Sequence, residues 1–331
     1  MRYRKLGRAG IKVSELALGS WITGGGNYPP EVSIATHRRA FELGINTFDT
    51  ADTYNRGQAE QVVGQALKGW VRSSVVLATK CAGQVGDGPN DVGLGRKHIR
   101  ESCDGSLQRL GTNYIDLYQA HRFDDQTPLE ETCRAFDDLV RAGKILYWGV
   151  SNWTGAQIAG ATGICGACGY DAPVSLQPRY NLFHRDIEAD QLPVCEKLGL
   201  GVLAFSPLCQ GVLTGKYCAG IPAGSRAATR EDFCGRQLVP YNQQAVQELL
   251  ALAGSAGMTL AQLSLAWLLR TDVLSAAIVG ASRAEQLDEL AAASGKTLSA
   301  DLLAEIQKVL ERRRAAVLED DARALREPAK I

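Results

Sequence analysis

A regular alternation of short apolar runs with amphipathic segments constrains the fold of this chain more than any other feature. Eight apolar runs bounded by turn residues are predicted strands, at residues 16–19, 45–48, 75–79, 115–120, 145–150, 175–177, 201–205 and 276–279. Segments with helical spacing lie between them, for example at residues 32–43, 60–67, 96–110, 129–142 and 191–197. Strands that alternate with helices favour a parallel sheet with helical crossovers. Eight such units predict one α/β domain over residues 1–331, a closed (β/α)8 TIM barrel.

An open doubly wound sheet is the alternative architecture. It requires a Gly-x-Gly-x-x-Gly turn directly after the first strand. The first predicted strand is instead followed by Ser-Trp-Ile-Thr-Gly-Gly-Gly at residues 20–26, which does not fit that spacing. The barrel is therefore the favoured fold.

Three further segments surround or interrupt the alternation. Residues 3–6 and 12–16 flank Gly-Arg-Ala-Gly, which predicts a small N-terminal β-hairpin. Residues 207–240 form a long connection rich in Gly, Arg and Cys, and so long a loop in a compact domain is usually functional. Residues 298–331 begin as a helix and end in charged residues, so we expect extra C-terminal helices that finish in a solvated helix or frayed tail.

The composition excludes several classes of function. Lys and Arg number 36 and Asp and Glu number 36, so the chain has no electrostatic footprint for nucleic acid or an anionic membrane. It has no apolar run of about 18 residues that would span a bilayer. The first residues lack an apolar signal core, so we expect a cytoplasmic protein.

The nine cysteines are scattered and odd in number, which favours reduced thiols. Cys165 and Cys168 form the one close pair and allow two interpretations, a redox or half-zinc motif and ordinary cysteines. No second pair at ligand spacing stands beside them, so ordinary cysteines are favoured and no metal site is predicted.

Reactive side chains stand at the ends of three consecutive predicted strands. Asp49 closes the second strand, Lys80 the third and His121 the fourth, while Tyr54 lies in the polar turn after Asp49. The carboxyl ends of barrel strands meet at one rim, which is where enzymes of this architecture work. Each residue alone has a structural explanation, such as an exposed lysine or a helix cap. Together they predict an active site.

These four side chains suit general acid catalysis, in which a lysine and an aspartate help a tyrosine to donate its proton. A free Tyr has a pKa of about 10 and is a poor proton donor at neutral pH. The Lys80 ammonium is expected to lower the pKa of Tyr54, and Asp49 to hold that ammonium in place. His121 would donate a hydrogen bond to a substrate carbonyl while Tyr54 protonates its oxygen. Because the protein has no hydride to give, a nicotinamide cofactor is needed.

Three motifs resemble those of the aldo-keto reductases, which use the same Asp, Tyr, Lys and His. The signature Asp-Thr-Ala-x-x-Tyr matches residues 49–54, and two further motifs match residues 143–152 and 278–287. The resemblance covers nearly the whole chain and is closest to the branch containing potassium-channel beta subunits, through residues 19–21, 206–208 and 215–217. Some members of that branch replace the catalytic His by Asn. This chain keeps His121, which favours an active enzyme over a sensor.

The resemblance implies an NADPH cofactor extended across the barrel rim. Ser151, Asn152 and Gln177 are expected to hold the carboxamide, with Tyr180 stacked on the nicotinamide. The remaining implied contacts are Ser20, Trp21, Asp49, Ser206, Pro207, Leu208, Gly211, Thr214, Lys216, Arg226, Gly280, Ser282, Arg283, Gln286 and Glu289. Rim residues expected to shape the substrate pocket are Trp21, Asn27, Tyr54, His121, Phe123 and Trp153.

Three features of the implied cofactor site bear on which nucleotide it binds. Arg226 and Arg283 suit a 2′-phosphate, so NADPH is expected over NADH. Leu290 stands where relatives commonly have Asn, which removes one adenine contact. The segment from Gly211 to Tyr217 is not a triphosphate-binding loop, because it has one residue too few between its glycines and Tyr where Ser or Thr must bind magnesium.

Three functions follow, from different classes. The first is NADPH-dependent reduction of a small-molecule aldehyde or ketone, and the second is a cofactor-sensing regulatory subunit with slow turnover. The third is a lyase or isomerase with Lys80 as a Schiff base, which the cofactor motifs disfavour. The sequence identifies neither the substrate nor the oligomeric state. It is compatible with a homo-oligomer.

Overall fold

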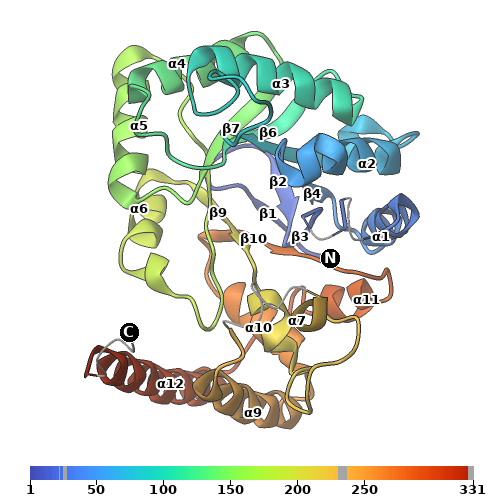
Figure 1. Cartoon of the computed structure of the whole chain (residues 1–331), viewed down its shortest axis with the longest axis vertical. Coiled ribbons are helices and arrows are strands. Elements are labelled where there is room, and N and C mark those ends of the chain that lie inside the picture. Colours follow the sequence, from blue (N-terminus) through green and yellow to red (C-terminus); the bar gives the residue numbers. More distant parts are fainter. Residues whose placement is uncertain (22, 25–27, 230–236, 327–331) are drawn as a thin grey trace.

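A closed parallel barrel forms the centre of the molecule (Figure 1). The computed structural model describes residues 1–21, 23–24, 28–229 and 237–326. The barrel strands follow one another in the order β10-β3-β4-β5-β6-β7-β8-β9, and all neighbouring pairs are parallel. Their bounds are β3 Leu16–Gly19, β4 Thr47–Asp49, β5 Val76–Cys81, β6 Ile115–Ala120, β7 Ile145–Ser151, β8 Ser175–Gln177, β9 Gly201–Phe205 and β10 Leu274–Val279. The predicted (β/α)8 barrel is confirmed, and the doubly wound alternative is excluded.

Helices enclose the barrel from outside. Figure 1 shows α3 to α6 arching around one side of the strands, with α9 and α12 packed side by side at the far end. The α-helices are α1 Pro30–Glu42, α2 Gln58–Leu67, α3 Arg96–Leu110, α4 Leu129–Arg141, α5 Gly155–Cys168, α6 Gln191–Leu198, α7 Arg226–Thr229, α9 Pro240–Ser255, α10 Leu260–Leu268, α11 Gln286–Ala291 and α12 Ala300–Arg326. The short 3₁₀ helices are η1 Tyr54–Gly57, η2 Arg72–Ser74, η3 Asp186–Glu188 and η4 Cys209–Thr214.

Local sequence explains where several helices begin and end. Thr154 and Thr259 start α5 and α10 through capping boxes, in which the hydroxyl accepts from the backbone N–H three residues later. Gly111 ends α3 at a φ of 65°, a left-handed conformation that side chains other than Gly adopt only with strain. The predicted helices at residues 96–110, 129–142 and 191–197 are confirmed, and their observed bounds lie within one residue of the predicted ones.

The N-terminal hairpin closes the amino end of the barrel. Its strands β1 Tyr3–Lys5 and β2 Lys12–Ser14 pair antiparallel, as predicted. Leu6 and Val13 are fully buried and pack with interior barrel residues from β3, β5, β6, β9 and β10. This apolar cluster fills the amino end of the barrel. The predicted catalytic side chains lie at the opposite end, where the strands finish.

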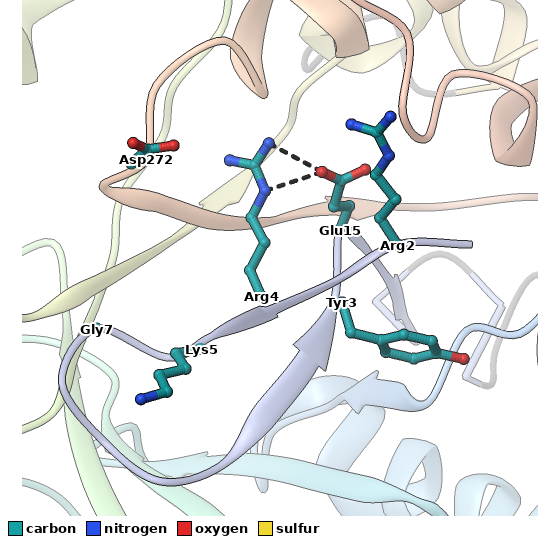
Figure 2. A pocket seen from close by; sticks show the side chains of 7 residues that line it. All are labelled: Arg2, Tyr3, Arg4, Lys5, Gly7, Glu15 and Asp272. Carbon is teal, nitrogen blue, oxygen red and sulfur yellow. Dashed lines mark hydrogen bonds and ion pairs between the residues drawn. The ribbon is translucent and has the colours of Figure 1, made fainter.

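A pocket under the barrel belongs to this closure (Figure 2). Arg4 points into it and forms an ion pair of 2.9 Å with Glu15, which is almost fully buried. The same guanidinium donates to the carbonyls of Leu269, Thr271 and Leu274, so its donors tie the hairpin to β10 and the end of α10. Asp49 and Lys80 are not among the lining residues. We therefore assign this pocket a structural role.

The long connection of residues 207–240 contains η4 and α7, and residues 230–236 lie outside the described part. After it, α9 and α10 form a pair bent by 90°. In the described part of the chain, no single helix is both long and apolar enough to cross a membrane. This bent pair reaches the required length and composition only when its two helices are taken together.

Candidate active site

The carboxyl end of the barrel brings the four predicted catalytic side chains together. Lys80 on β5 extends its Nζ to 2.7 Å from Asp49 Oδ2 on β4. The same Nζ lies 3.3 Å from the Tyr54 hydroxyl, and the rings of Tyr54 and His121 meet edge to face at a centroid distance of 5.6 Å. The convergence follows from topology, because β4, β5 and β6 are neighbours in the barrel.

Lys80 is a fully buried charge with all three protons directed at acceptors. Besides Asp49 and Tyr54 it donates to the carbonyl of Thr50 at 2.7 Å. Burial alone would lower the pKa of Lys80, but Asp49 and Tyr54 together outweigh it and raise that pKa above its usual value. Lys80 therefore remains an ammonium. A charged amine is a poor Schiff-base nucleophile, which argues against the lyase alternative.

Tyr54 is held by a tight turn at the start of η1. Its backbone N–H donates to the carbonyl of Ala51, and the two following residues, Asn55 and Arg56, have φ values of 47° and 53°. Such left-handed residues cost energy and gather at functional sites. Gly57, with a φ of 83°, then returns the chain into α2. The strained turn aims the phenol back over the end of β5.

The pKa of Tyr54 corrects one expectation. Burial raises the pKa of this phenol above 10.0, and the Lys80 ammonium opposes that rise without cancelling it. Loss of water around the buried ring, which the expectation did not include, outweighs the effect of the ammonium. Tyr54 is therefore a protonated phenol whose hydroxyl lies beside a fixed positive charge, and the ammonium favours the phenolate once a proton leaves.

His121 enters this site as a neutral ring. Its backbone N–H donates to the carbonyl of Cys81 at 2.8 Å, which fixes it at the end of β6. Burial, reinforced by the Lys80 ammonium and Arg122, lowers the pKa of His121 to about 3. A neutral imidazole can donate one hydrogen bond without competing with Tyr54 as the acid.

A network of amide and hydroxyl groups lies beside the four predicted catalytic side chains. Gln177 Nε2 donates to Asp49 Oδ1 at 2.8 Å, and the Ser151 hydroxyl donates to the Gln177 carbonyl at 2.9 Å. Asn152 Nδ2 donates to Ser151 Oγ at 3.0 Å, and Asn152 holds a left-handed φ of 59°. The structure thus joins the three residues expected to bind a carboxamide into one network with Asp49.

Gln119 completes that network and was missed in the sequence. It is fully buried on β6, and its side-chain amide reaches Asp49 Oδ1 at 3.4 Å and Gln177 Nε2 at 3.3 Å. The available signal was its place two residues before His121, which puts it on the same face of the strand.

The segment after β9 forms a polar cradle. Ser206 begins it with a φ of 52°, and its carbonyl accepts from Asn181 Nδ2 at 2.9 Å. Gly211 has a φ of 96°, and a Cβ there would lie 3.1 Å from the ammonium of Lys216. Glycine therefore lets Lys216 fold back over the turn, where Thr214 Oγ1 donates to the Gly211 carbonyl at 2.8 Å.

This segment also reaches across the rim. The guanidinium of Arg226 in α7 lies 5.5 Å from the centre of the Trp21 ring, which follows β3. Strands β9 and β3 flank β10 in the barrel, so the contact spans the carboxyl end of β10. There the Gln286 amide oxygen accepts from both the backbone N–H and the hydroxyl of Ser282. The implied cofactor residues of the three regions thus border one strip of the rim.

A family model described as the aldo/keto reductase family matches residues 15–311. The matched region contains all eight barrel strands. The chain belongs to the aldo/keto reductase family.

Curated relatives agree with this assignment. A "probable voltage-gated potassium channel subunit beta" from Oryza sativa subsp. japonica is 41% identical over 295 residues, or 87% of this chain and 90% of the relative. A "putative voltage-gated potassium channel subunit beta" from Schizosaccharomyces pombe is 43% identical over 296 residues, or 87% of this chain and 86% of the relative. A similarly described protein from Arabidopsis thaliana is 40% identical over 295 residues, with 87% and 90% covered. The resemblance read from the sequence motifs is confirmed.

One implied contact of this aldo/keto reductase, Tyr180, lies in unexpected surroundings. Tyr180 is 1% exposed, and its hydroxyl donates to Glu188 at 2.6 Å while its ring packs on Trp267. That placement leaves Tyr180 almost no free ring face for a nicotinamide. Phe205, the last residue of β9 and the neighbour of Ser206, is half-buried and packs against the apolar interior of the barrel.

The expected substrate pocket is described in part. Trp153 is fully buried beneath Phe123, with ring centroids 4.9 Å apart, so it supports that ring instead of presenting its own surface. Trp21 is 39% exposed at the rim. Asn27 lies outside the described residues. The exposed ring of Trp21 and the half-buried ring of Phe123 are therefore the apolar candidates for lining a substrate pocket.

Two further residues of the implied cofactor site lie at the surface. Arg283 and Glu289 are exposed at α11, and the Glu289 carbonyl accepts from Gln262. Leu290 is buried in the core. In the aldo/keto reductase, Cys165 is a buried free thiol of α5 and Cys168 an exposed one. No group of three or more metal-ligating side chains was found in the described segments.

Proposed function

We propose that this protein reduces an aldehyde or ketone to an alcohol with NADPH. The observation that carries the proposal is the contact of the Lys80 ammonium with both the Asp49 carboxylate and the Tyr54 hydroxyl. It gives a protonated phenol a fixed positive neighbour, which is what a general acid needs when its proton leaves.

The residues of the rim fit a nicotinamide dinucleotide. Ser151, Asn152 and Gln177 offer amide and hydroxyl groups in one network, which matches a carboxamide. The turn at Gly211 brings the ammonium of Lys216 close to the backbone, and this cation suits a pyrophosphate. When bound, the cofactor supplies the hydride.

The chain's own groups would act on the substrate oxygen. His121 donates a hydrogen bond that orients the carbonyl, and Tyr54 gives its proton to the same oxygen as charge develops there. The Lys80 ammonium stabilises the resulting phenolate, and Asp49 keeps that ammonium in place. Solvent then returns the proton to Tyr54.

Cofactor preference is proposed to rest on Arg226 and Arg283. The two cofactors differ at the 2′-phosphate, which carries nearly two negative charges. An arginine fork binds such a group through paired, charge-assisted hydrogen bonds. Arg226 borders the rim strip already, through its contact with Trp21.

The test is a spectrophotometric assay of NADPH consumption with a panel of simple aldehydes, quinones and sugars. Turnover that needs both cofactor and carbonyl supports the proposal. Tight NADPH binding without turnover on any substrate class would overturn it.

A second function is favoured by the names of the relatives. They are described as voltage-gated potassium channel beta subunits, so a cofactor-sensing regulatory subunit with slow turnover is the alternative. The neutral His121 beside Tyr54 favours the enzyme. A cytoplasmic location stays a prediction.

A further inference from the structure

A second buried carboxyl group, that of Asp52, lies close to the backbone of Lys80. Asp52 stands two residues before Tyr54 and is 1% exposed. Its backbone N–H donates to the Lys80 carbonyl at 3.2 Å, so its position is tied to the residue that contacts Tyr54. Neither carboxyl oxygen has a side-chain hydrogen-bond partner among the described residues. A buried carboxylate without a side-chain partner is costly, whereas a protonated carboxyl group is tolerated, and a backbone hydrogen bond from Thr53 only partly offsets that cost.

Glu60 makes ionisation of Asp52 still less favourable. Glu60 is fully buried in α2, where Thr79 donates to it at 2.6 Å and Arg109 forms an ion pair at 2.6 Å. The charge of Arg109 is thereby matched by Glu60, and a second buried carboxylate would have no cation of its own. The carboxylate of Glu60 therefore disfavours a second negative charge on Asp52.

Other titratable groups face Asp52 from each neighbouring element. They are Glu60 on α2, Arg109 on α3, Lys80 and Cys81 on β5, Tyr118 on β6 and Tyr54 on η1. Burial and, after it, Glu60 raise the pKa of Asp52 to about 7, while Arg109, a backbone hydrogen bond from Thr53 and Lys80 oppose that rise. A negative Asp52 in turn raises the pKa of Tyr54.

We propose that Asp52 is a positioning residue of the reduction, a buried carboxyl group that must be neutral for Tyr54 to release its proton readily. The role rests on the proposed reduction. When Asp52 is neutral, Asp49 is the carboxylate that balances the Lys80 ammonium. When Asp52 ionises, a second negative charge stands near the forming phenolate and disfavours it.

The first experiment is the pH dependence of kcat for wild type and Asp52→Asn with a neutral aldehyde and saturating NADPH. Wild type is expected to lose activity with one ionisation near pH 7, about tenfold one unit above it. The Asn variant, which cannot ionise, is expected to match wild type at pH 6 and to keep its activity at pH 8. Asp137→Asn is the control, since Asp137 is buried on α4 and partnered by Arg141.

The second experiment reads the protonation of Asp52 without turnover. Its folded pKa lies above the unfolded value of 3.8, so the contribution of Asp52 to the stability of wild type falls as pH rises from about 4 to 7, and Asp52→Asn lacks this pH-dependent contribution. The melting temperature of the variant relative to wild type is expected to increase from pH 5 to pH 8. Asp52→Ser repeats the measurement if Asn is not accommodated.

The outcomes separate the two proposals. An activity limb that persists unchanged in both neutral variants would overturn the role of Asp52 while leaving the reductase proposal standing. A stability difference that does not change with pH would also overturn it, because Asp52 would then be ionised throughout. Wild type that never turns over would overturn the proposed function itself, whatever the melting curves show.

Discussion

Lys80 Nζ lies 3.3 Å from the Tyr54 hydroxyl, and this contact joins the end of a barrel strand to the turn that follows its neighbour. The lysine is fully buried and paired with Asp49, so water does not screen its charge. A positive charge held in this way stabilises a phenolate far more than an exposed lysine would.

Lys80→Met is expected to lower kcat by at least a hundredfold and to move the pH profile of any residual activity upward. The reason is that the pKa of Tyr54, already raised by burial, loses the ammonium that opposes the rise. Kinetics from pH 5 to 9 would check this.

The same substitution leaves Asp49 buried without its cation, at a cost of about 3–5 kcal/mol in stability. The double variant Asp49→Asn, Lys80→Met removes both charges and is expected to recover much of the lost stability without activity. An unchanged pH profile in Lys80→Met would show that the lysine does not act on Tyr54.

His121→Asn is expected to reduce kcat by roughly tenfold to a hundredfold, because one donor to the carbonyl oxygen is weakened. Cofactor affinity should change little. The pKa of His121 is about 3, so wild type should show no activity limb from this residue between pH 5 and 8.

The depressed pKa of His121 also has a sign for stability. His121 binds a proton near pH 6.5 in the unfolded chain but not in the folded protein, so the contribution of this residue to stability falls as pH drops from 6.5 towards 3. His121→Asn should reduce that loss in melting curves measured between pH 7 and 4. Equal slopes for variant and wild type would contradict a neutral His121.

Arg226→Ala is expected to weaken NADPH and leave NADH nearly unaffected. One charge-assisted hydrogen bond contributes roughly 1.5–3 kcal/mol, and exposure at the rim reduces this, so the loss should be about tenfold. The preference should also narrow at high salt, because rim charges are screened. Fluorescence titration of both cofactors measures it.

Arg122→Ala supplies the matched control, since it removes an equal charge from another rim loop. If Arg226→Ala weakens both cofactors equally, Arg226 acts through its contact with Trp21 and the proposed 2′-phosphate contact is wrong.

Much of the fold could be predicted because barrel strands are short apolar runs bounded by turn residues. The strands at residues 16–19, 115–120, 175–177 and 201–205 have the predicted bounds. Convergence of Asp49, Lys80 and His121 followed from the same reasoning, since neighbouring parallel strands end at one rim.

Properties that depend on burial could not be predicted in this way. The pKa of Tyr54 depends on how much water surrounds the ring, and the orientation of Tyr180 depends on Glu188 and Trp267 packing outside the barrel. Asp52 lies within the matched signature, yet only its burial beside Glu60 distinguishes it from a solvated acid.

The most direct test of the account compares wild type with Tyr54→Phe in NADPH-dependent reduction of an aromatic aldehyde. The substitution keeps the ring that packs against His121 and removes the hydroxyl that lies beside Lys80. We expect kcat to fall by about 10²–10⁴-fold while the NADPH dissociation constant stays within about twofold. Unchanged turnover in the purified variant would contradict Tyr54 as the proton donor.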